Sequence, residues 1–307
     1  MHAFCRRMSA ATFCGLLTFS AWNGPALAHE AAQDERLAYS LMIGGLHVGD
    51  AVVTLSQDSD SYATSLKLTA GGVAKWVREF RADLSGEGTF AAGGENAQPL
   101  PTSYRRDWSG SEIDSSLLMT YDPATRIPLT KERYIQRETG AELSYEDLPW
   151  NKNDRGRDRK KPVPEDKRTG AMDPMAAFIA ARHQVMTQVA DKTPIKFRVP
   201  VYDGQRRYDI VGNTTAPRAV TINGQQHTVI TVNTTLVPIA GFSERGEERM
   251  RESRGKILFT ADNRFIPVQV TIENDLLSGV MNLTGDCKVT PESCNPVTQQ
   301  ASTSTQN

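Results

Sequence analysis

The sequence contains few of the residues on which metal, redox and nucleophilic sites depend. It has four cysteines and five histidines in 307 residues. The cysteines are too few and too scattered for a zinc ribbon or a cysteine-rich scaffold, and no two histidines have a metal-ligand spacing on a recognisable element. We therefore expect no metal site, and nothing in the sequence indicates a cofactor.

An excess of charge of either sign is also missing. The 35 basic and 36 acidic residues nearly cancel, which disfavours nucleic acid as a partner, because a binder of that kind relies on a positive surface. With 39% hydrophobic and 23% charged residues, the composition suits a water-soluble globular protein. Any binding would depend on local patches.

Catalytic motifs are missing as well. Ser109 does not lie in a Gly-x-Ser-x-Gly setting, and the glycine pairs at 44–45 and 71–72 lack the lysine and helix of a phosphate-binding loop. We therefore expect a protein that is not an enzyme. A hydrolase assembled from distant residues, dependent on His47 or His183, is the alternative.

The first 28 residues have the three parts of a secretory signal peptide. Arg6 and Arg7 precede an apolar run from Ala10 to Trp22, and Ala26-Leu27-Ala28 forms a small-x-small cleavage pattern. The run is shorter than the roughly 20 residues that span a bilayer, which argues against an N-terminal anchor and an integral membrane protein. We predict cleavage after Ala28 and export.

Export bears on the two cysteines that cleavage would leave. Cys287 and Cys294 are separated by six residues, and an exporting pathway leads to compartments that permit disulfides. We predict a local disulfide between them, with two free thiols as the alternative. This bond would stabilise the end of the domain by about 3 kcal/mol at most.

Alternation of apolar with small or polar residues dominates the rest of the chain and predicts half-buried strands. Strands are expected over the following ranges, the last of them interrupted by a turn at Asn274-Asp275: 37–43, 48–55, 62–69, 80–90, 101–108, 112–121, 131–135, 195–202, 207–212, 219–222, 228–237, 248–260 and 268–283. Asn223-Gly224 is the strongest hairpin signal among them. The stretch from Val73 to Phe80 is consistent with either a short helix or a continued strand.

One helix stands out from this pattern. Asp173 is a suitable N-cap and Pro174 a suitable first residue, and an apolar stripe follows as far as Val189. Before it, Asn151 to Arg168 is rich in charge and predicts a solvated basic loop. Residues 29–294 are expected to form a single β-rich domain, and the polar tail over 295–307 to be disordered.

A dozen or so strands and one helix predict a mainly β fold. Large twisted sheets tend to curl because twist accumulates and edges need cover. We expect a curved antiparallel sheet or partly closed β-barrel, with the helix packed on or in its concave face.

Two sets of residues are candidate binding sites. Apolar side chains of the helix region would form an adaptable ligand pocket, with core packing as the alternative role: Met172, Met175, Phe178, Ile179 and Met186. Basic residues of the loop would bind an anionic partner such as lipid headgroups, with a simple solubilising loop as the alternative: Arg157, Arg159, Lys160 and Lys161.

Several short motifs resemble a known family of exported bacterial proteins, that of domain of unknown function 3108. They are Tyr39-Ser40-Leu41, Val48-Gly49-Asp50-Ala51, Tyr62 to Leu68, Pro101-Thr102-Ser103-Tyr104, Met172 to Phe178, and Arg264-Phe265-Ile266-Pro267-Val268. The resemblance implies a β-rich periplasmic domain, similar in shape to the half-barrels that carry or sense lipoproteins and lipids in the bacterial envelope. It supplies no catalytic residues, and the insertion at 151–168 departs from the usual spacing.

These observations lead to a hypothesis about function. We expect a periplasmic domain whose concave apolar face binds a lipid, an acyl chain or a hydrophobic protein segment in cell-envelope maintenance. The alternative from another class is an envelope scaffold that docks a protein partner.

Overall fold

The computed structural model describes residues 33–74, 80–91, 98–149, 161–191, 193–274 and 277–288. The first half of the sheet contains β1 (Gln33–Ile43), β2 (Leu46–Gln57), β3 (Ser61–Ala70), β4 (Arg81–Phe90), β5 (Pro99–Ser109), β6 (Ile113–Tyr121), β7 (Pro128–Gln136) and β8 (Glu142–Leu143). The second half contains β9 (Lys196–Tyr202), β10 (Arg207–Thr214), β11 (Arg218–Ile222), β12 (Gln225–Ala240), β13 (Arg254–Thr260), β14 (Pro267–Asn274) and β15 (Leu277–Asp286). The helices are η2 (Tyr145–Asp147, a 3₁₀ helix), α3 (Glu165–Arg168), α4 (Pro174–Asp191) and α5 (Glu244–Glu252).

Some sequence predictions fall outside the described residues. They are the signal peptide over 1–28, the patch residues Arg157, Arg159 and Lys160, the cysteine Cys294, the tail over 295–307 and most of the stretch from Val73 to Phe80.

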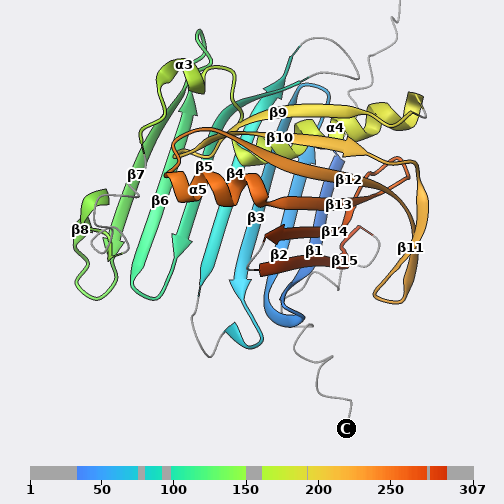
Figure 1. The fold of residues 1–307 in the computed structure, drawn as a ribbon, viewed down its shortest axis with the longest axis horizontal. Helices are drawn as coiled ribbons and strands as arrows, with labels where there is room; N and C mark the ends of the chain where they lie inside the picture. The colour runs from blue at the N-terminus through green and yellow to red at the C-terminus, as the bar shows by residue number, and fades with distance from the viewer. Residues whose placement is uncertain are drawn as a thin grey trace, which may run out of the picture. The chain divides into compact units, whose positions relative to one another are not determined.

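The described strands form one antiparallel sheet, in the order β8-β7-β6-β5-β4-β3-β2-β1-β15-β14-β13-β12-β10-β9, with β11 attached to β12. The two halves meet where β1 pairs with β15, from Leu37 opposite Asp286 to Ile43 opposite Gly279. The end strands β8 and β9 do not pair with each other, so the sheet is not closed. The prediction of a mainly β fold with one large curved antiparallel sheet is therefore confirmed. Figure 1 shows the strands of the second half running across those of the first.

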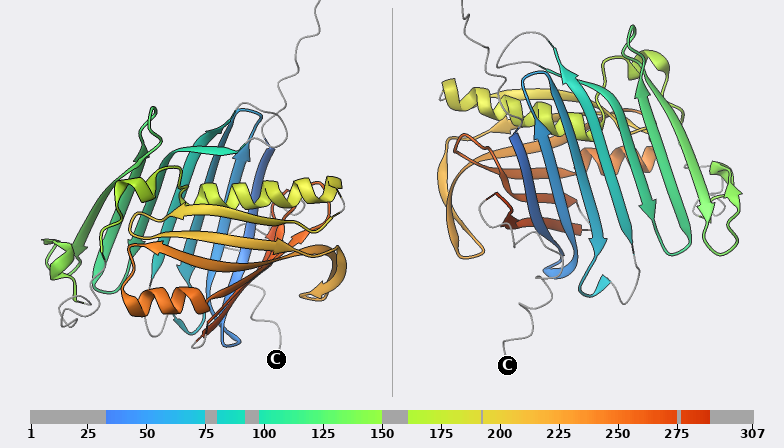
Figure 2. Two further views of the ribbon diagram at one scale, coloured as in Figure 1. Left: turned by 45° about the horizontal axis from the view of Figure 1, so that its top comes forward. Right: turned by 180° about the vertical axis from the view of Figure 1, so that it is seen from behind.

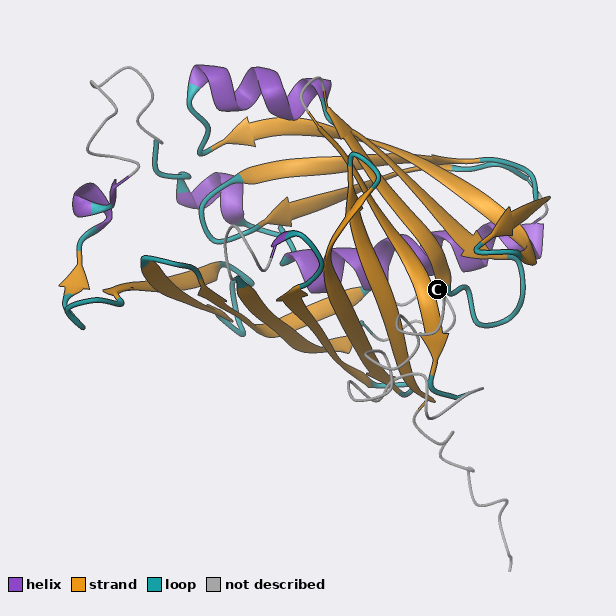
Figure 3. Ribbon diagram, turned by 90° about the horizontal axis from the view of Figure 1, so that it is seen from below, coloured by secondary structure: helices purple, strands orange, loops and turns teal. Residues whose placement is uncertain are grey.

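Helix α4 lies between the two halves. Ile179 packs in one core cluster with Leu55 and Tyr62 of the first half, and Val185 belongs to another that contains Phe259 of the second half. Figure 2 shows α4 from two sides of the molecule, and Figure 3 shows it between the two halves of the sheet. Among the helix residues whose side chains the structure describes, the buried ones are Met175, Ala176, Ala177, Ile179, Ala180, Ala181, Arg182 and Val185. The run of alanines keeps the helix thin enough to fit there.

Two expectations about secondary structure were wrong in part. Residues 248–252, expected to begin a strand, belong to helix α5, because Ser243 caps its first turn by accepting a hydrogen bond from the amide of Gly246 at 3.2 Å. Acidic residues in the first turn and arginines in the last also favour the helix. The expected loop over Asn151 to Arg168 ends instead in helix α3.

The two ends of the sheet are covered in different ways. At β9, the segment before α4 adds a single parallel bridge between Met172 and Val201. At β7, strand β8 pairs with only Tyr134 and Ile135, and the guanidinium of Arg168 donates to the carbonyl of Pro128 at 2.9 Å. Both devices occupy backbone groups that an open edge would otherwise expose.

Candidate functional site

The helix residues predicted as a ligand pocket differ in burial. Met175 and Ile179 are buried, Met172 and Phe178 are half-buried, and Met186 is exposed. The core-packing alternative therefore describes Met175 and Ile179, because α4 contacts both halves of the sheet. Met172, Phe178 and Met186 keep some exposure, and the strands supply further apolar side chains that a ligand would reach.

Strand alternation divides those side chains between an inner face, which bears α4, and an outer face. Toward the α4 end, Tyr39 and Ala51 lie opposite each other on the inner face and are buried. The next row of side chains, further from the helix, crosses the four strands β1, β15, β14 and β13. Its members lie directly opposite one another and are half-buried: Leu41, Met281, Val270 and Ile257. Exposure thus increases with distance from α4.

The row at the far rim is the most exposed. Leu46 lies opposite Ile43, Ile43 opposite Gly279, and Gly279 opposite Ile272. The exposed fractions of the three large side chains are 59% for Leu46, 36% for Ile43 and 58% for Ile272. A Cβ atom on Gly279 would have no neighbour within 4 Å, so this position leaves open space between two isoleucines.

The same face continues across the first half of the sheet. Leu66 and Leu84 are half-buried, and the exposed indole of Trp108 stacks on the ring of Phe80 with centroids 5.6 Å apart. We call the half-buried and exposed apolar residues of this face the inner apolar surface: Leu41, Ile43, Leu46, Val53, Leu66, Leu68, Leu84, Trp108, Ile257, Val270, Ile272 and Met281. Apolar area that stays in contact with water is typical of a binding surface.

A charged pair lies beside this surface. Arg106 of β5 is opposite Leu84 and shares the inner face. Its Nη2 atom lies 3.8 Å from Oε1 of Glu132, which also accepts a hydrogen bond from Gln205 at 2.7 Å. The hydroxyl of Tyr134 donates to the other oxygen of Glu132 at 2.9 Å.

Asp173 is a fully buried carboxylate at the start of α4. Its Oδ1 accepts hydrogen bonds from the amides of Met175 and Ala176, both at 2.9 Å, which confirms the predicted N-cap. Burial raises the pKa of Asp173 to about 6, although the two amide donors oppose the shift. Burial also raises the pKa of the neighbouring Tyr121, whose hydroxyl lies 3.5 Å from Oδ2.

A second buried polar group ties α4 to the junction of the two sheet halves. Arg182 donates to Oε1 of the buried Glu35 at 3.0 Å and also to the carbonyl of Arg264. Arg264 in turn pairs with Asp286. These residues come from α4, β1, the β13–β14 turn and β15, so the network connects four parts of the chain.

The residues considered for catalysis have structural partners. Nε2 of His47 lies 3.0 Å from Asp50, and Nε2 of His183 lies 3.2 Å from Gln57. The hydroxyl of Ser109 donates to Asp114 at 2.5 Å. Within the described residues, no group of three or more histidine, cysteine, aspartate or glutamate side chains is arranged to hold a metal ion.

Lys161 and Cys287 are the two remaining predicted site residues that the structure describes. Lys161 is exposed, as an anion-binding residue requires. The amide of Cys287 donates to the carbonyl of Arg36 at 3.0 Å, which holds this position against β1. The bond from Cys287 to Cys294 stays a prediction.

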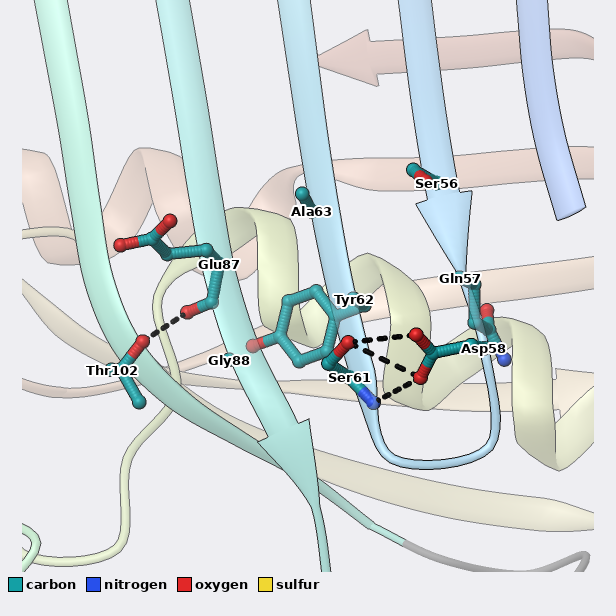
Figure 4. A pocket seen from close by; sticks show the side chains of 9 residues that line it. All are labelled: Ser56, Gln57, Asp58, Ser61, Tyr62, Ala63, Glu87, Gly88 and Thr102. Atoms are coloured by element: carbon teal, nitrogen blue, oxygen red, sulfur yellow. Dashed lines mark hydrogen bonds between the residues drawn. The ribbon is translucent and has the colours of Figure 1, made fainter. Parts of the chain in front are cut away.

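A polar depression of about 280 Å³ opens among β2, β3, β4 and β5. Figure 4 shows Asp58 accepting hydrogen bonds from the amide and hydroxyl of Ser61, and Thr102 donating to the carbonyl of Glu87. Because most of its lining residues are polar, the depression does not suit an acyl chain.

These features define a class of protein with an open antiparallel sheet, an enclosed helix and a solvent-reachable apolar inner face. The chain belongs to the family described as "Protein of unknown function (DUF3108)", whose model matches residues 38–284. The resemblance noted in the sequence is thereby confirmed.

Comparisons with individual proteins add little about function. No curated protein matches the chain. A solved β-barrel-like protein of domain of unknown function DUF1849 from Brucella abortus is similar over 82% of this chain and 96% of its own, with 11% sequence identity and a TM-score of 0.45. No described helix combines the length and apolar character that crossing a bilayer requires.

Proposed function

We propose that this protein is a non-enzymatic periplasmic binding protein whose inner apolar surface takes up a lipid, an acyl chain or a hydrophobic protein segment in envelope maintenance. The observation that carries the proposal is the graded exposure of the inner face, from buried Tyr39 through half-buried Leu41 to exposed Ile43. Each methylene group removed from water there contributes about 0.8 kcal/mol. Helix α4 forms the closed end of the site.

Binding of the uncharged dye N-phenyl-1-naphthylamine tests this proposal. We expect its fluorescence to rise with wild-type protein, and Ile272→Glu to weaken binding about tenfold, because the substitution places a charge on the apolar face. Leu129→Glu is the matched control, since Leu129 is 56% exposed but lies on the outer face of β7. Equal effects of the two substitutions, or no fluorescence change with wild type, would count against the proposal.

Ligands that copurify give a second test. Mass spectrometry of organic extracts from protein isolated from its native host should recover a lipid or another apolar molecule. The predicted export rests on the signal pattern, and an N-terminus at His29 in the isolated protein would support it.

A scaffold that docks an envelope protein is the second candidate. It is favoured by a depression of about 310 Å³ on the face of β5 to β8, lined by Leu118 together with charged residues such as Arg105, Lys131 and Glu142. A mixed apolar and charged lining is typical of protein interfaces. An empty protein that retains one reproducible partner, lost in Leu118→Glu, would favour this function.

A further inference from the structure

We propose that Arg106 anchors the carboxylate of a long-chain fatty acid whose acyl chain lies along the inner apolar surface. This inference rests on the proposed function and deepens it, because it assigns the polar end of the ligand. It is carried by the placement of one cation among apolar neighbours.

Arg106 lies within the apolar inner face rather than at a charged rim. It is directly opposite Leu84 on β4 and Leu117 on β6, and Trp108 lies two residues further along the same face of β5. Its side chain is 28% exposed, so solvent and solutes reach it. A partly desolvated guanidinium interacts more strongly with an anion than one in bulk water.

The ion pair between Arg106 and Glu132 leaves the guanidinium without a close hydrogen bond. The 3.8 Å separation from Glu132 exceeds hydrogen-bond range, and no closer partner of Arg106 is found among the described residues. Glu132 is itself engaged by Gln205 and Tyr134. The guanidinium therefore keeps hydrogen-bond donors for another acceptor.

A path for an acyl chain begins beside Arg106. The pairings place Leu84, Leu66 and Val53 in a single half-buried row that continues from the arginine across β4, β3 and β2. Three strand spacings correspond to about 14 Å. A chain lying along this row would cover three apolar side chains while its head remains at Arg106.

The charge at this position favours a carboxylate as the head. One arginine with Glu132 nearby provides little net positive charge, which disfavours a doubly charged phosphate monoester. A carboxylate carries one charge and matches the planar guanidinium through two parallel hydrogen bonds. The ligand chemistry that fits is therefore a monoanionic fatty acid.

Paired ligands and paired variants test the anchor. Isothermal titration would compare dodecanoate with dodecanol in wild type, Arg106→Met and Arg81→Met. Arg81 is the matched control, because it lies on the neighbouring strand β4 but pairs with Asp83 at 2.7 Å on the outer face. We expect wild type and Arg81→Met to bind dodecanoate about tenfold more tightly than dodecanol, and Arg106→Met to lose this preference while binding dodecanol normally.

The outcomes separate the two proposals. If dodecanol and dodecanoate bind wild type equally, or if Arg106→Met keeps the preference, the anchor is refuted and the apolar site stands. If neither ligand binds the wild-type protein, both proposals fail. Arg106→Lys retains the charge and should recover part of the preference, which separates recognition from a folding defect in Arg106→Met.

Discussion

At Asp173, the sequence predicts one property of the residue, its role as an N-cap, but not its burial or its pKa. Its place before Pro174 predicts the N-cap, and the two amide hydrogen bonds confirm it. Its complete burial follows from the packing of Tyr121 and the α4 turn around it, which the local sequence does not contain. The resulting pKa of about 6 is therefore a property of the fold.

The Asp173→Asn variant tests that shift. The folded pKa exceeds the unfolded value, so the folded state binds more protons between about pH 4 and pH 6, and the free energy of unfolding falls as pH rises through that range. Asparagine keeps an oxygen for the amides of Met175 and Ala176 and does not titrate. Urea unfolding should show wild type losing about 2–3 kcal/mol relative to the variant between pH 4 and pH 7. Parallel pH profiles for the two proteins would contradict a buried, titrating Asp173.

Helix α4 marks the limit of prediction at the scale of elements. Its start and approximate length follow from the cap and the apolar stripe, but a stripe predicts one buried side, whereas Ile179 and Val185 contact opposite halves of the sheet. The stripe also predicts a pocket of Met172, Met175, Phe178, Ile179 and Met186, of which Met175 and Ile179 are buried. Alternation predicts the inner-facing residues of each strand. Which end of the inner face stays exposed to water depends on where α4 lies, and the strand sequences do not contain that information.

The pairing of Arg182 with Glu35 is a test of how α4 is held. Arg182→Met would leave Arg264, at 3.8 Å, as the one cation paired with the buried Glu35 among the described residues. We expect a loss of about 3–5 kcal/mol in the free energy of unfolding, because a buried charge loses its closest partner. The double variant Glu35→Gln, Arg182→Met should regain part of this loss.

A control for this pair exists on the surface. Arg81 pairs with Asp83 at 2.7 Å in an exposed position, so Arg81→Met should change urea unfolding little. If Arg182→Met and Arg81→Met behave alike, the Arg182 network does not hold the helix.

At the scale of the whole molecule, the sheet is most secure at its centre and weakest at one end. Strands β1 and β15 pair with neighbours on both sides, whereas β7 has only the short β8 beyond it. Backbone groups of successive residues along a strand point to alternate sides. The backbone groups of Thr130 and Glu132 therefore point toward the same edge as those of Pro128. Between Arg168 and β8, no described strand covers them.

Hydrogen exchange would reveal this difference. We expect the amides of Thr130 and Glu132 to exchange much faster than those of Tyr39 and Leu41, since edge amides open without disturbing the central sheet. Exchange with residue-level resolution at neutral pH is the measurement. Equal protection would mean that another part of the chain covers the edge.

The hydroxyl of Tyr39 finds its acceptor in Pro267 at 2.9 Å, 228 residues later in the chain. Contacts that distant form slowly, since a long loop must close before they contribute. During synthesis, the apolar side chains of the early strands therefore stay exposed to water until the last strands are made. We expect newly made chains to depend on chaperones throughout that interval.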